Sequence, residues 1–409
     1  MKKTSTRILT LLLALVMALG ALTACGGPEK PSEPDNSAST PPKQEEPAAA
    51  GPQTPPAQPE ESADDKLVLE GAMPLDYAEG FHIDLYEGGY RMITAGSDTG
   101  EQFLVVPEGK SVPEDLDPAV KVLQQPIENV YIASTGMVSL LDAIGALDAV
   151  KLVGSEVSGW YIDGVVERME DGRIEFGGKY SEPDYEQMTA KNIQLHVDTT
   201  MVNNNPEVLE KFDELGIPNF VETSSAEGHP LARVEWIKVF GVILGYEEEA
   251  QRYFEEQKAL LEAATAAEPS GKTVAMGYIT SSDKCYARNG GDYMAQMIGL
   301  AGGEYIRADM KSDEGGNSNL TFEDWYAGFK DADCLFYVNF ARSFESIDDM
   351  IAYNPLFADF KSVQNGNVWV TSKDFTQSTA AIASIVSDMN QILASEDGDI
   401  TTDHLIKLS

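Results

Sequence analysis

Cysteine is scarce in this chain of 409 residues, which contains only Cys25, Cys285 and Cys334. A small domain held together by several disulfides is therefore excluded. Cys285 and Cys334 are able to form one pair, but two buried free thiols are the state that we expect. Cys25 has a different setting, at the end of an apolar N-terminal run.

Histidine is almost as rare, with four residues at positions 82, 196, 229 and 404. A zinc or manganese site in a cleft normally needs two or three histidines near carboxylates. Only His229 falls on a loop that suits a cleft, and His196 lies inside an apolar strand, where a hydrogen-bonded core histidine is expected. We therefore predict no metal site.

The common catalytic motifs are missing as well. The sequence has no P-loop, no G-x-G-x-x-G after a strand, no H-E-x-x-H and no G-x-S-x-G. Ser224, Ser225 and His229 are close in sequence, but closeness within one loop does not provide the geometry of a catalytic triad. The sequence disfavours an enzyme, and we predict neither catalytic residues nor a cofactor.

Basic residues are few: 29 Lys and Arg stand against 67 Asp and Glu, for a formal charge of −38. Such a surface repels nucleic acids and anionic lipid headgroups, so we expect no nucleic-acid partner. Solvation of surface carboxylates is enough to explain most of the excess of acidic over basic residues. The charge therefore excludes partners without naming one.

The N-terminus has the features of an exported lipoprotein. Three basic residues precede an apolar run from Ile8 to Leu22, which is short for a bilayer span and ends in Leu-Thr-Ala-Cys. We predict a signal peptide over residues 1–24 and lipidation of Cys25, giving lasting anchorage at the extracytoplasmic face of a bacterial cell membrane. An ordinary cleaved signal with a chance cysteine is the alternative.

Residues 25–66 are rich in Pro and Glu. Ten of the 21 prolines lie here, and the stretch after Cys25 has no Leu, Ile, Val or aromatic residue. Because such a stretch cannot bury enough apolar surface to order itself, we predict a disordered tether. Residues 67–120 then alternate apolar and polar residues in FHIDLY, YRMITA and QFLVVP, separated by turn residues, which predicts a small antiparallel β extension.

Strands and helices alternate over residues 121–245, the predicted N-terminal lobe. Apolar strands are expected at 129–134, 151–155, 174–178, 193–200 and 219–223, and helices at 137–144, 161–169, 184–189, 206–215 and 231–244. Continuous apolar strands between helices imply a parallel sheet covered on both faces.

One long amphipathic helix is predicted over Glu247–Ala267, within a connecting segment 246–268. Ala250, Phe254 and Leu261 share its apolar side with Tyr253 and Ala264. A second lobe, residues 269–409, repeats the alternation, with strands expected at 273–279, 334–339 and 367–372 and helices at 292–300, 322–329, 346–353 and 379–393. The predicted fold is thus α/β, with two Rossmann-like lobes of parallel sheet joined by one long helix, plus the β extension.

Aromatic and basic residues gather in loops that follow the predicted strands, where open α/β sheets bind ligands. Such side chains suit a large, partly anionic, ring-bearing ligand through stacking and charge-assisted hydrogen bonds. The candidate ligand-binding residues are Trp160, Tyr161, Lys179, Tyr180, His229, Arg233, Tyr278, Arg288 and Arg342. Local loop packing is the competing explanation for each aromatic residue.

Several stretches resemble a known family. LGYEEEA leading into the long helix and IGLAGGEYI in the second lobe are the most specific, and the resemblance runs from about Asn129 to Leu393. The chain is similar to substrate-binding proteins of ABC importers for iron-siderophore, haem and cobalamin. The resemblance implies a monomer that binds a metal-chelate or tetrapyrrole-like ligand between its lobes and delivers it to an ABC permease and its ATPase.

The resemblance also implies two docking residues. In this family one glutamate on each lobe contacts arginines of the permease, and Glu186 and Glu323 match those positions. Both begin predicted helices, where the helix dipole favours carboxylates in any case. The segment STGMVSLLDA lacks a glutamate that relatives often have, and the β extension is not a general family feature, so the ligand's identity does not carry over.

Three other functions compete with this hypothesis. A receptor of the same architecture for a bare metal ion would need three or four His, Asp or Glu side chains converging in the cleft. A surface enzyme acting on a metal complex would need a titratable pair with perturbed pKa there. A structural or adhesive lipoprotein would not need two lobes.

Overall fold

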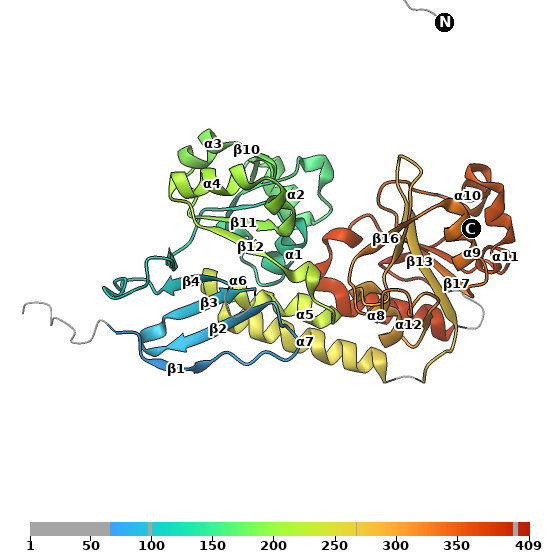
Figure 1. Ribbon diagram of the computed structural model, residues 1–409, viewed down its shortest axis with the longest axis horizontal. Helices are drawn as coiled ribbons and strands as arrows, with labels where there is room; N and C mark the ends of the chain where they lie inside the picture. Colours follow the sequence, from blue (N-terminus) through green and yellow to red (C-terminus); the bar gives the residue numbers. More distant parts are fainter. Residues whose placement is uncertain (1–65, 97–99, 267, 396–399) are drawn as a thin grey trace, which may run out of the picture. The chain divides into compact units, whose positions relative to one another are not determined.

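The computed structural model (Figure 1) describes residues 66–96, 100–266, 268–395 and 400–409. The predicted signal peptide, Cys25 and the tether up to residue 65 lie outside the described residues. None of the helices within these ranges is long and apolar enough to cross a bilayer.

The β extension is a five-stranded sheet in which chain order is also spatial order. Its strands are β1 (Leu69–Ala72), β2 (Phe81–Tyr86), β3 (Arg91–Ala95), β4 (Glu101–Val106) and β5 (Lys121–Gln124). Along β2, Phe81 and Ile83 are buried and His82 is exposed, as the alternation predicted. The first four strands are antiparallel, whereas β5 joins β4 in parallel, so the sheet runs past residue 120.

The N-terminal lobe has a fully parallel sheet in the order β12-β11-β6-β7-β8. Its strands are β6 (Val130–Ile132), β7 (Val150–Val153), β8 (Glu175–Phe176), β11 (Leu195–Thr199) and β12 (Asn219–Glu222). Its helices are α1 (Thr135–Ala143), α2 (Asp163–Glu170), α3 (Tyr185–Ala190), α4 (Pro206–Leu215), α5 (Pro230–Glu235) and α6 (Ile237–Leu244). The predicted helix 231–244 is therefore two helices that meet at Trp236.

The C-terminal lobe has a mixed sheet in the order β16-β14-β13-β17-β18-β19, with β15 also paired to β13. The strands are β13 (Thr273–Ile279), β14 (Cys285–Arg288), β15 (Glu304–Tyr305), β16 (Asn317–Leu320), β17 (Cys334–Tyr337), β18 (Val368–Thr371) and β19 (Leu405–Lys407). The predicted strands β13, β17 and β18 are parallel, and β14, β16 and β19, which were not predicted, are antiparallel. The helices are α8 (Tyr293–Leu300), α9 (Phe322–Phe329), α10 (Ile347–Tyr353), α11 (Lys361–Gln364) and α12 (Ile382–Ala394).

Both cysteines of this lobe are buried free thiols, as expected. Burial raises the pKa of Cys285 to about 11 and that of Cys334 well above its ordinary range. Both sulfurs therefore remain protonated, and they act as small apolar groups.

The connecting helix α7 (Glu247–Thr265) confirms the predicted helix. Its buried stripe is Ala250, Phe254, Gln257, Leu261 and Ala264. This is the predicted apolar side with Gln257 added and with Tyr253 only half-buried. The helix packs on α6 of the first lobe and on α12 of the second. It therefore packs against both lobes, and the lobes belong to one compact unit.

Two buried carboxylates hold the loop between β1 and β2 against the first lobe. Glu235, which is completely buried, accepts backbone hydrogen bonds of 2.8 Å from Asp76, Tyr77 and Ala78. Lys238 pairs with Glu235 at 2.8 Å and donates to the Pro74 carbonyl. Glu227 accepts from the backbone of Glu79 and Gly80 and from the indole of Trp236 in the same way.

The β extension also contacts the connecting helix directly. Asp76 pairs with Lys258 of α7, and Arg91 of β3 pairs with Glu247 at the start of α7. Such partly exposed pairs contribute modestly on their own, but they lie at two points along one helix. The β extension therefore holds α7 through two ion pairs, in addition to the packing of α7 on the first lobe.

We predict that Glu235→Ala destabilises the protein by about 3–5 kcal/mol, because it leaves Lys238 as an unpaired buried charge and three amides without an acceptor. Urea denaturation measures the free energy of unfolding. Glu256→Ala, on an exposed position of α7, is the control and should have little effect. Equal stability of the two variants would contradict this role of Glu235.

Candidate ligand-binding site

The carboxyl edges of the two sheets meet at a seam between the lobes. Gly136 lies in the first turn of α1, which follows β6, and a Cβ there would lie 2.8 Å from the hydroxyl of Thr379, in the segment after β18. Ala380 in that segment donates its backbone N–H to the Ser139 hydroxyl at 3.1 Å. Since open α/β sheets bind ligands outside the carboxyl ends of their strands, this seam is the floor of the candidate site.

A second set of contacts reinforces the seam. The Gln377 side chain donates to the Gly159 carbonyl at 2.6 Å and accepts from the Tyr161 N–H at 3.0 Å. Gln377 is buried and comes from the second lobe, whereas Gly159 and Tyr161 follow β7 of the first. One amide side chain of the second lobe thus binds the backbone of the first lobe at two points.

The first lobe has a cavity of about 400 Å³ at its carboxyl edge. Its lining follows β6, β7 and β8 and consists of Ala133, Gly154, Ser155, Glu156, Ser158, Gly159, Phe176, Lys179 and Tyr180. The small residues of this lining leave room for a ligand. One cation, two hydroxyl-bearing serines and two aromatic rings are available to contact it. Two of the predicted ligand residues, Lys179 and Tyr180, are brought together here.

The second lobe has an aromatic and polar wall on one face of its sheet. Tyr278 and Tyr286 are paired across β13 and β14, and their rings stack at 5.1 Å. Phe340, after β17, meets Tyr278 edge-on and is 64% exposed. Arg288 lies two residues beyond Tyr286 and so on the same face, opposite the exposed Asn317 of β16.

Burial raises the pKa of Tyr278, and the nearby Arg288 guanidinium opposes that shift. The hydroxyl is therefore a neutral donor at physiological pH. Of the predicted residues, Tyr278 and Arg288 share this wall, although they lie on strands rather than in the predicted loop. The sequence analysis missed Tyr286, Phe340 and Asn317; the turn residues between TVAMGYI and CYAR are the signal that would have predicted the hairpin.

The remaining predicted residues have other positions. Trp160 is buried, and its indole donates to the carbonyl of Ser155, a lining residue of the cavity, at 3.0 Å. The Tyr161 side chain is 46% exposed beside the seam. Arg342 pairs with Asp283 at 2.6 Å and lies over the ring of Tyr353, within its own lobe.

His229 is engaged with the β extension. Its ring stacks on Tyr77 at 4.3 Å, and its Nδ1 accepts the Leu231 N–H at the start of α5. Burial lowers the pKa of His229, so the ring is neutral and acts as a cap. It is not among the residues that line the cavity of the first lobe.

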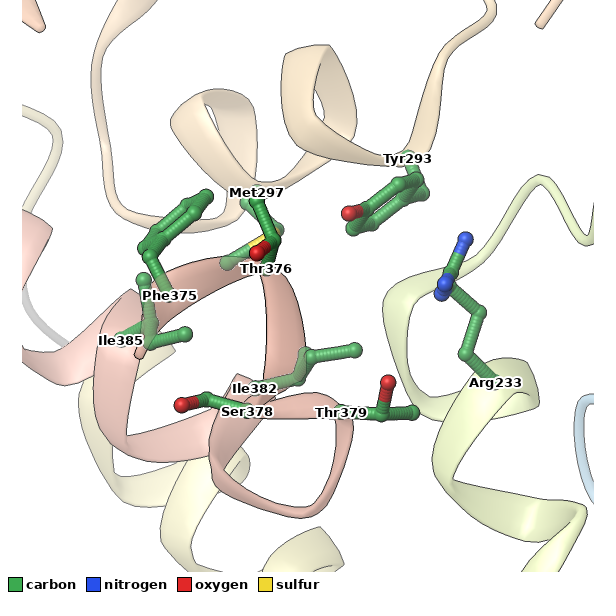
Figure 2. Close-up of a pocket in the computed structure, with 9 residues that line it drawn as sticks. All are labelled: Arg233, Tyr293, Met297, Phe375, Thr376, Ser378, Thr379, Ile382 and Ile385. Atoms are coloured by element: carbon green, nitrogen blue, oxygen red, sulfur yellow. The ribbon is translucent and has the colours of Figure 1, made fainter. Parts of the chain in front are cut away.

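Arg233 lies at the seam itself. Its guanidinium carbon is 4.0 Å from the centre of the Tyr293 ring, which belongs to α8 of the second lobe. Figure 2 shows the two side chains facing each other above the Thr379 hydroxyl. A slot of about 20 Å³ lies beside them.

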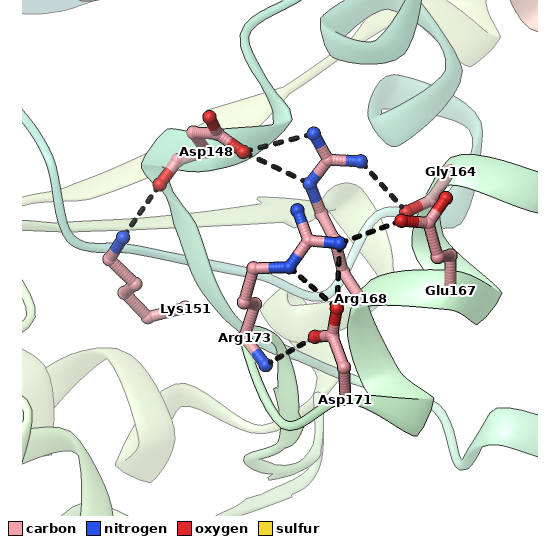
Figure 3. A network of polar contacts seen from close by, with 7 residues as sticks. All are labelled: Asp148, Lys151, Gly164, Glu167, Arg168, Asp171 and Arg173. Carbon is pink, nitrogen blue, oxygen red and sulfur yellow. Dashed lines mark hydrogen bonds and ion pairs between the residues drawn. The ribbon is translucent and has the colours of Figure 1, made fainter.

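A cluster of basic residues at the opposite edge of the first lobe is a different kind of feature (Figure 3). Lys151, Arg168 and Arg173 line a surface cavity near the amino end of β7. Arg168 pairs with Asp148, and Arg173 pairs with both Asp171 and Glu167. Because carboxylates balance these cations, the cluster is a charge network of the surface.

Glu186 and Glu323 are exposed in the first turns of α3 and α9. Helix α3 follows the hairpin β9 (Gly178–Lys179) and β10 (Glu182–Pro183), beyond the carboxyl end of β8. Helix α9 follows β16, which runs in the same direction as β13 because both are antiparallel to β14. Both glutamates therefore lie at the carboxyl edge of their own sheet, one on each lobe.

No group of three or more His, Cys, Asp or Glu side chains is arranged to hold a metal ion within the part of the chain that the structure describes. His196 is a buried core residue, stacked on Phe212 and Tyr131 and bonded to Asn219, as expected from its strand.

Comparison with known proteins supports this architecture. A family model described as periplasmic binding protein matches residues 178–375. A periplasmic heme binding protein of Pseudomonas aeruginosa superposes with a TM-score of 0.53 at 14% identity, over 69% of this chain and 98% of that protein. The chain has the periplasmic binding protein fold. The family resemblance predicted from the sequence is confirmed.

Two further proteins share parts of this likeness. A possible iron-binding, periplasmic solute-binding protein of Staphylococcus epidermidis has the same fold, with a TM-score of 0.52 at 14% identity over 66% of this chain and 100% of that protein. An uncharacterized lipoprotein of Methanocaldococcus jannaschii is 29% identical over 294 residues, which cover 68% of this chain and 69% of that protein.

A second cavity at the seam, of about 360 Å³, lies beside α7 and is lined in part by Asp142, Tyr253 and His404. Burial raises the pKa of Asp142. The hydrogen bond of 2.8 Å from His404 Nδ1 to Asp388 raises the pKa of His404 above its ordinary value of 6.5.

We predict a pH-dependent contribution of His404 to stability. Because its folded-state pKa is raised, the pair with Asp388 stabilises the fold fully below pH 6.5, and this contribution is lost as the pH rises through the folded-state pKa. The difference in free energy of unfolding between wild type and His404→Gln should therefore be larger below pH 6.5 than above it. Urea denaturation at a series of pH values measures it, and a pH-independent difference would refute the titration.

Proposed function

We propose that this protein is a lipid-anchored, extracytoplasmic substrate-binding protein of an ABC importer. It binds an iron-siderophore, haem or cobalamin-like ligand between its lobes and performs no chemistry on it. The observation that carries the proposal is the meeting of two carboxyl edges at one seam, with a cavity in the first lobe and an aromatic wall in the second. Concave sites with aromatic lining and few polar groups are typical of small-molecule binding.

The composition of the wall favours a ring-bearing ligand. Stacked tyrosines and the exposed ring of Phe340 offer flat apolar surface, and Lys179, Arg233 and Arg288 offer positive charge to an anionic chelate. The names of the structural relatives, iron-binding and heme-binding, agree with this class. A bare-metal receptor is the alternative, but the described residues provide no ligand cluster for it.

The connecting helix supports a stiff receptor. Helix α7 packs on both lobes, and the β extension holds it at two ion pairs. Wide hinge closure requires connecting residues that absorb large backbone changes, and a continuous helix resists them. We therefore propose that the ligand enters a largely preformed site and that lobe motion is small.

We predict that Lys179→Ala and Tyr278→Ala each weaken ligand binding by about tenfold or more, since each removes a charge-assisted hydrogen bond or an aromatic contact. Tryptophan fluorescence of the purified protein, titrated with haem, a ferric siderophore or cobalamin, measures Kd. Lys211→Ala, on an exposed position of α4, is the control. Unchanged affinity in both test variants would place the ligand elsewhere.

We propose that Glu186 and Glu323 dock the loaded receptor on arginines of the permease. The double variant Glu186→Lys/Glu323→Lys should abolish uptake and leave ligand affinity unchanged, because charge reversal creates repulsion only at the docking face. Glu207→Lys/Asp348→Lys is a matched control, with the same change of charge at the first turns of α4 and α10. Loss of uptake in the control as well, or weakened ligand binding in the test variant, would refute this separation of roles.

A further inference from the structure

One loop forms a large part of the lining of the first-lobe cavity. Residues 155–161, which follow β7 and which we name the β7 loop, contribute to that lining Ser155, Glu156, Ser158 and Gly159. The loop contains one short 3-10 turn, Val157–Gly159, in which Val157 is 41% exposed. A short exposed loop opens more easily than the sheet beneath it, so its contacts decide whether the cavity keeps its shape.

Two sets of contacts hold the β7 loop in place. Inside the first lobe, the buried Trp160 donates its indole N–H to the Ser155 carbonyl at 3.0 Å. The second set comes from Gln377 of the other lobe, which binds the backbone on both sides of Trp160. Its amide donates to the Gly159 carbonyl at 2.6 Å and accepts from the Tyr161 N–H at 3.0 Å. The loop is therefore attached to the second lobe through one side chain.

Gln377 is itself held in place. It is 6% exposed, and its backbone N–H donates to the Asp374 carbonyl at 2.7 Å. Three residues further on, the N–H of Ala380 donates to the Ser139 hydroxyl of α1. The carbonyl of Ala380 accepts a hydrogen bond of 3.1 Å from the Tyr253 hydroxyl of α7. Because α1 and α7 both bind this segment of the second lobe, the amide of Gln377 has a fixed position beside the β7 loop.

The chemistry of a carboxamide suits this task. Gln377 offers one donor and one acceptor at a fixed spacing, and the loop presents one carbonyl and one N–H to it. An ionised glutamate has nearly the same shape but only accepts hydrogen bonds. It would keep the bond from Tyr161 and place its second oxygen against the Gly159 carbonyl. A side chain that only filled space would tolerate this exchange.

We propose that Gln377 is a positioning residue of the ligand site, which holds the β7 loop as a preformed wall of the first-lobe cavity. The inference rests on the proposed function, and it adds a residue of the second lobe that acts on ligand bound in the first. A wall that is already in place spares the ligand the cost of ordering the loop. Without Gln377 the loop leaves the bound ligand more often, so the ligand dissociates faster.

Hydrogen–deuterium exchange of the full chain in detergent, followed by mass spectrometry, tests the attachment of the loop without any ligand. Gln377→Ala should exchange about tenfold faster than wild type in peptides that cover the β7 loop, because two hydrogen bonds are lost. Peptides of α7 should exchange as in wild type. Gln377→Glu should behave like Gln377→Ala.

Gln125→Ala is the matched control. The Gln125 side chain also donates to two backbone carbonyls, those of Val242 and Ile243, within the first lobe. It is not among the residues that line the cavity. The β7 loop of this variant should therefore exchange as in wild type.

Stopped-flow tryptophan fluorescence then measures association and dissociation rates with three probes: haem, a ferric tris-hydroxamate siderophore and cobalamin. For each probe that wild type binds, Gln377→Ala and Gln377→Glu should raise the dissociation rate about tenfold and leave the association rate within about twofold. Gln125→Ala should leave both rates unchanged. A residue needed only for the stability of the fold would not separate the two rates in this way.

Other results overturn the inference in distinguishable ways. Unchanged exchange of the β7 loop in Gln377→Ala would show that Gln377 does not hold it, and faster exchange throughout the chain would make Gln377 a residue of general stability. A released loop with unchanged dissociation rates would show that the ligand does not use this wall, and would leave the proposed function standing. If wild type bound none of the three probes, the proposed ligand class would fail, and this role of Gln377 with it.

Discussion

The buried carboxylate of Glu235 is the interaction on which the arrangement of the rest depends. It is completely buried, and it binds three successive amides of the loop before β2 and the buried ammonium of Lys238. A charge in such a place is stable only when every lone pair has a donor. The loop, the first lobe and, through Asp76 and Lys258, the connecting helix are therefore held in one relationship.

The two lobes contribute unlike surfaces to the site. The first lobe offers a cavity built by small residues, one of which, Ser155, accepts a hydrogen bond from Trp160. The second offers flat aromatic rings on a strand pair. The seam beneath them is held by short polar contacts such as those of Gln377. With the function proposed above, such a site would discriminate between ligands by shape and charge, because the two surfaces are largely preformed.

Local patterns predicted most of the framework, because periodicity reports which face of an element is buried. The long helix, the parallel strands and the two buried thiols follow from such patterns. The antiparallel strands β14, β16 and β19 were missed because they are short and their pairing depends on neighbours. The contacts of His229 with Tyr77 and of Arg342 with Asp283 could not be predicted either, because the partners lie far apart in the sequence. Hydrophobic periodicity thus identifies the buried face of a helix or strand. Which polar residues remain available to a ligand depends on tertiary contacts, which periodicity does not report.

The position of β1 has a mechanical consequence. The chain enters the described fold at Lys66 and passes at once into this edge strand, which is antiparallel to β2. Tension applied from the N-terminal side is thus borne first by the hydrogen bonds between β1 and β2. The pairing of β1 with β2 therefore takes up such a force before it reaches the loop that Glu235 holds.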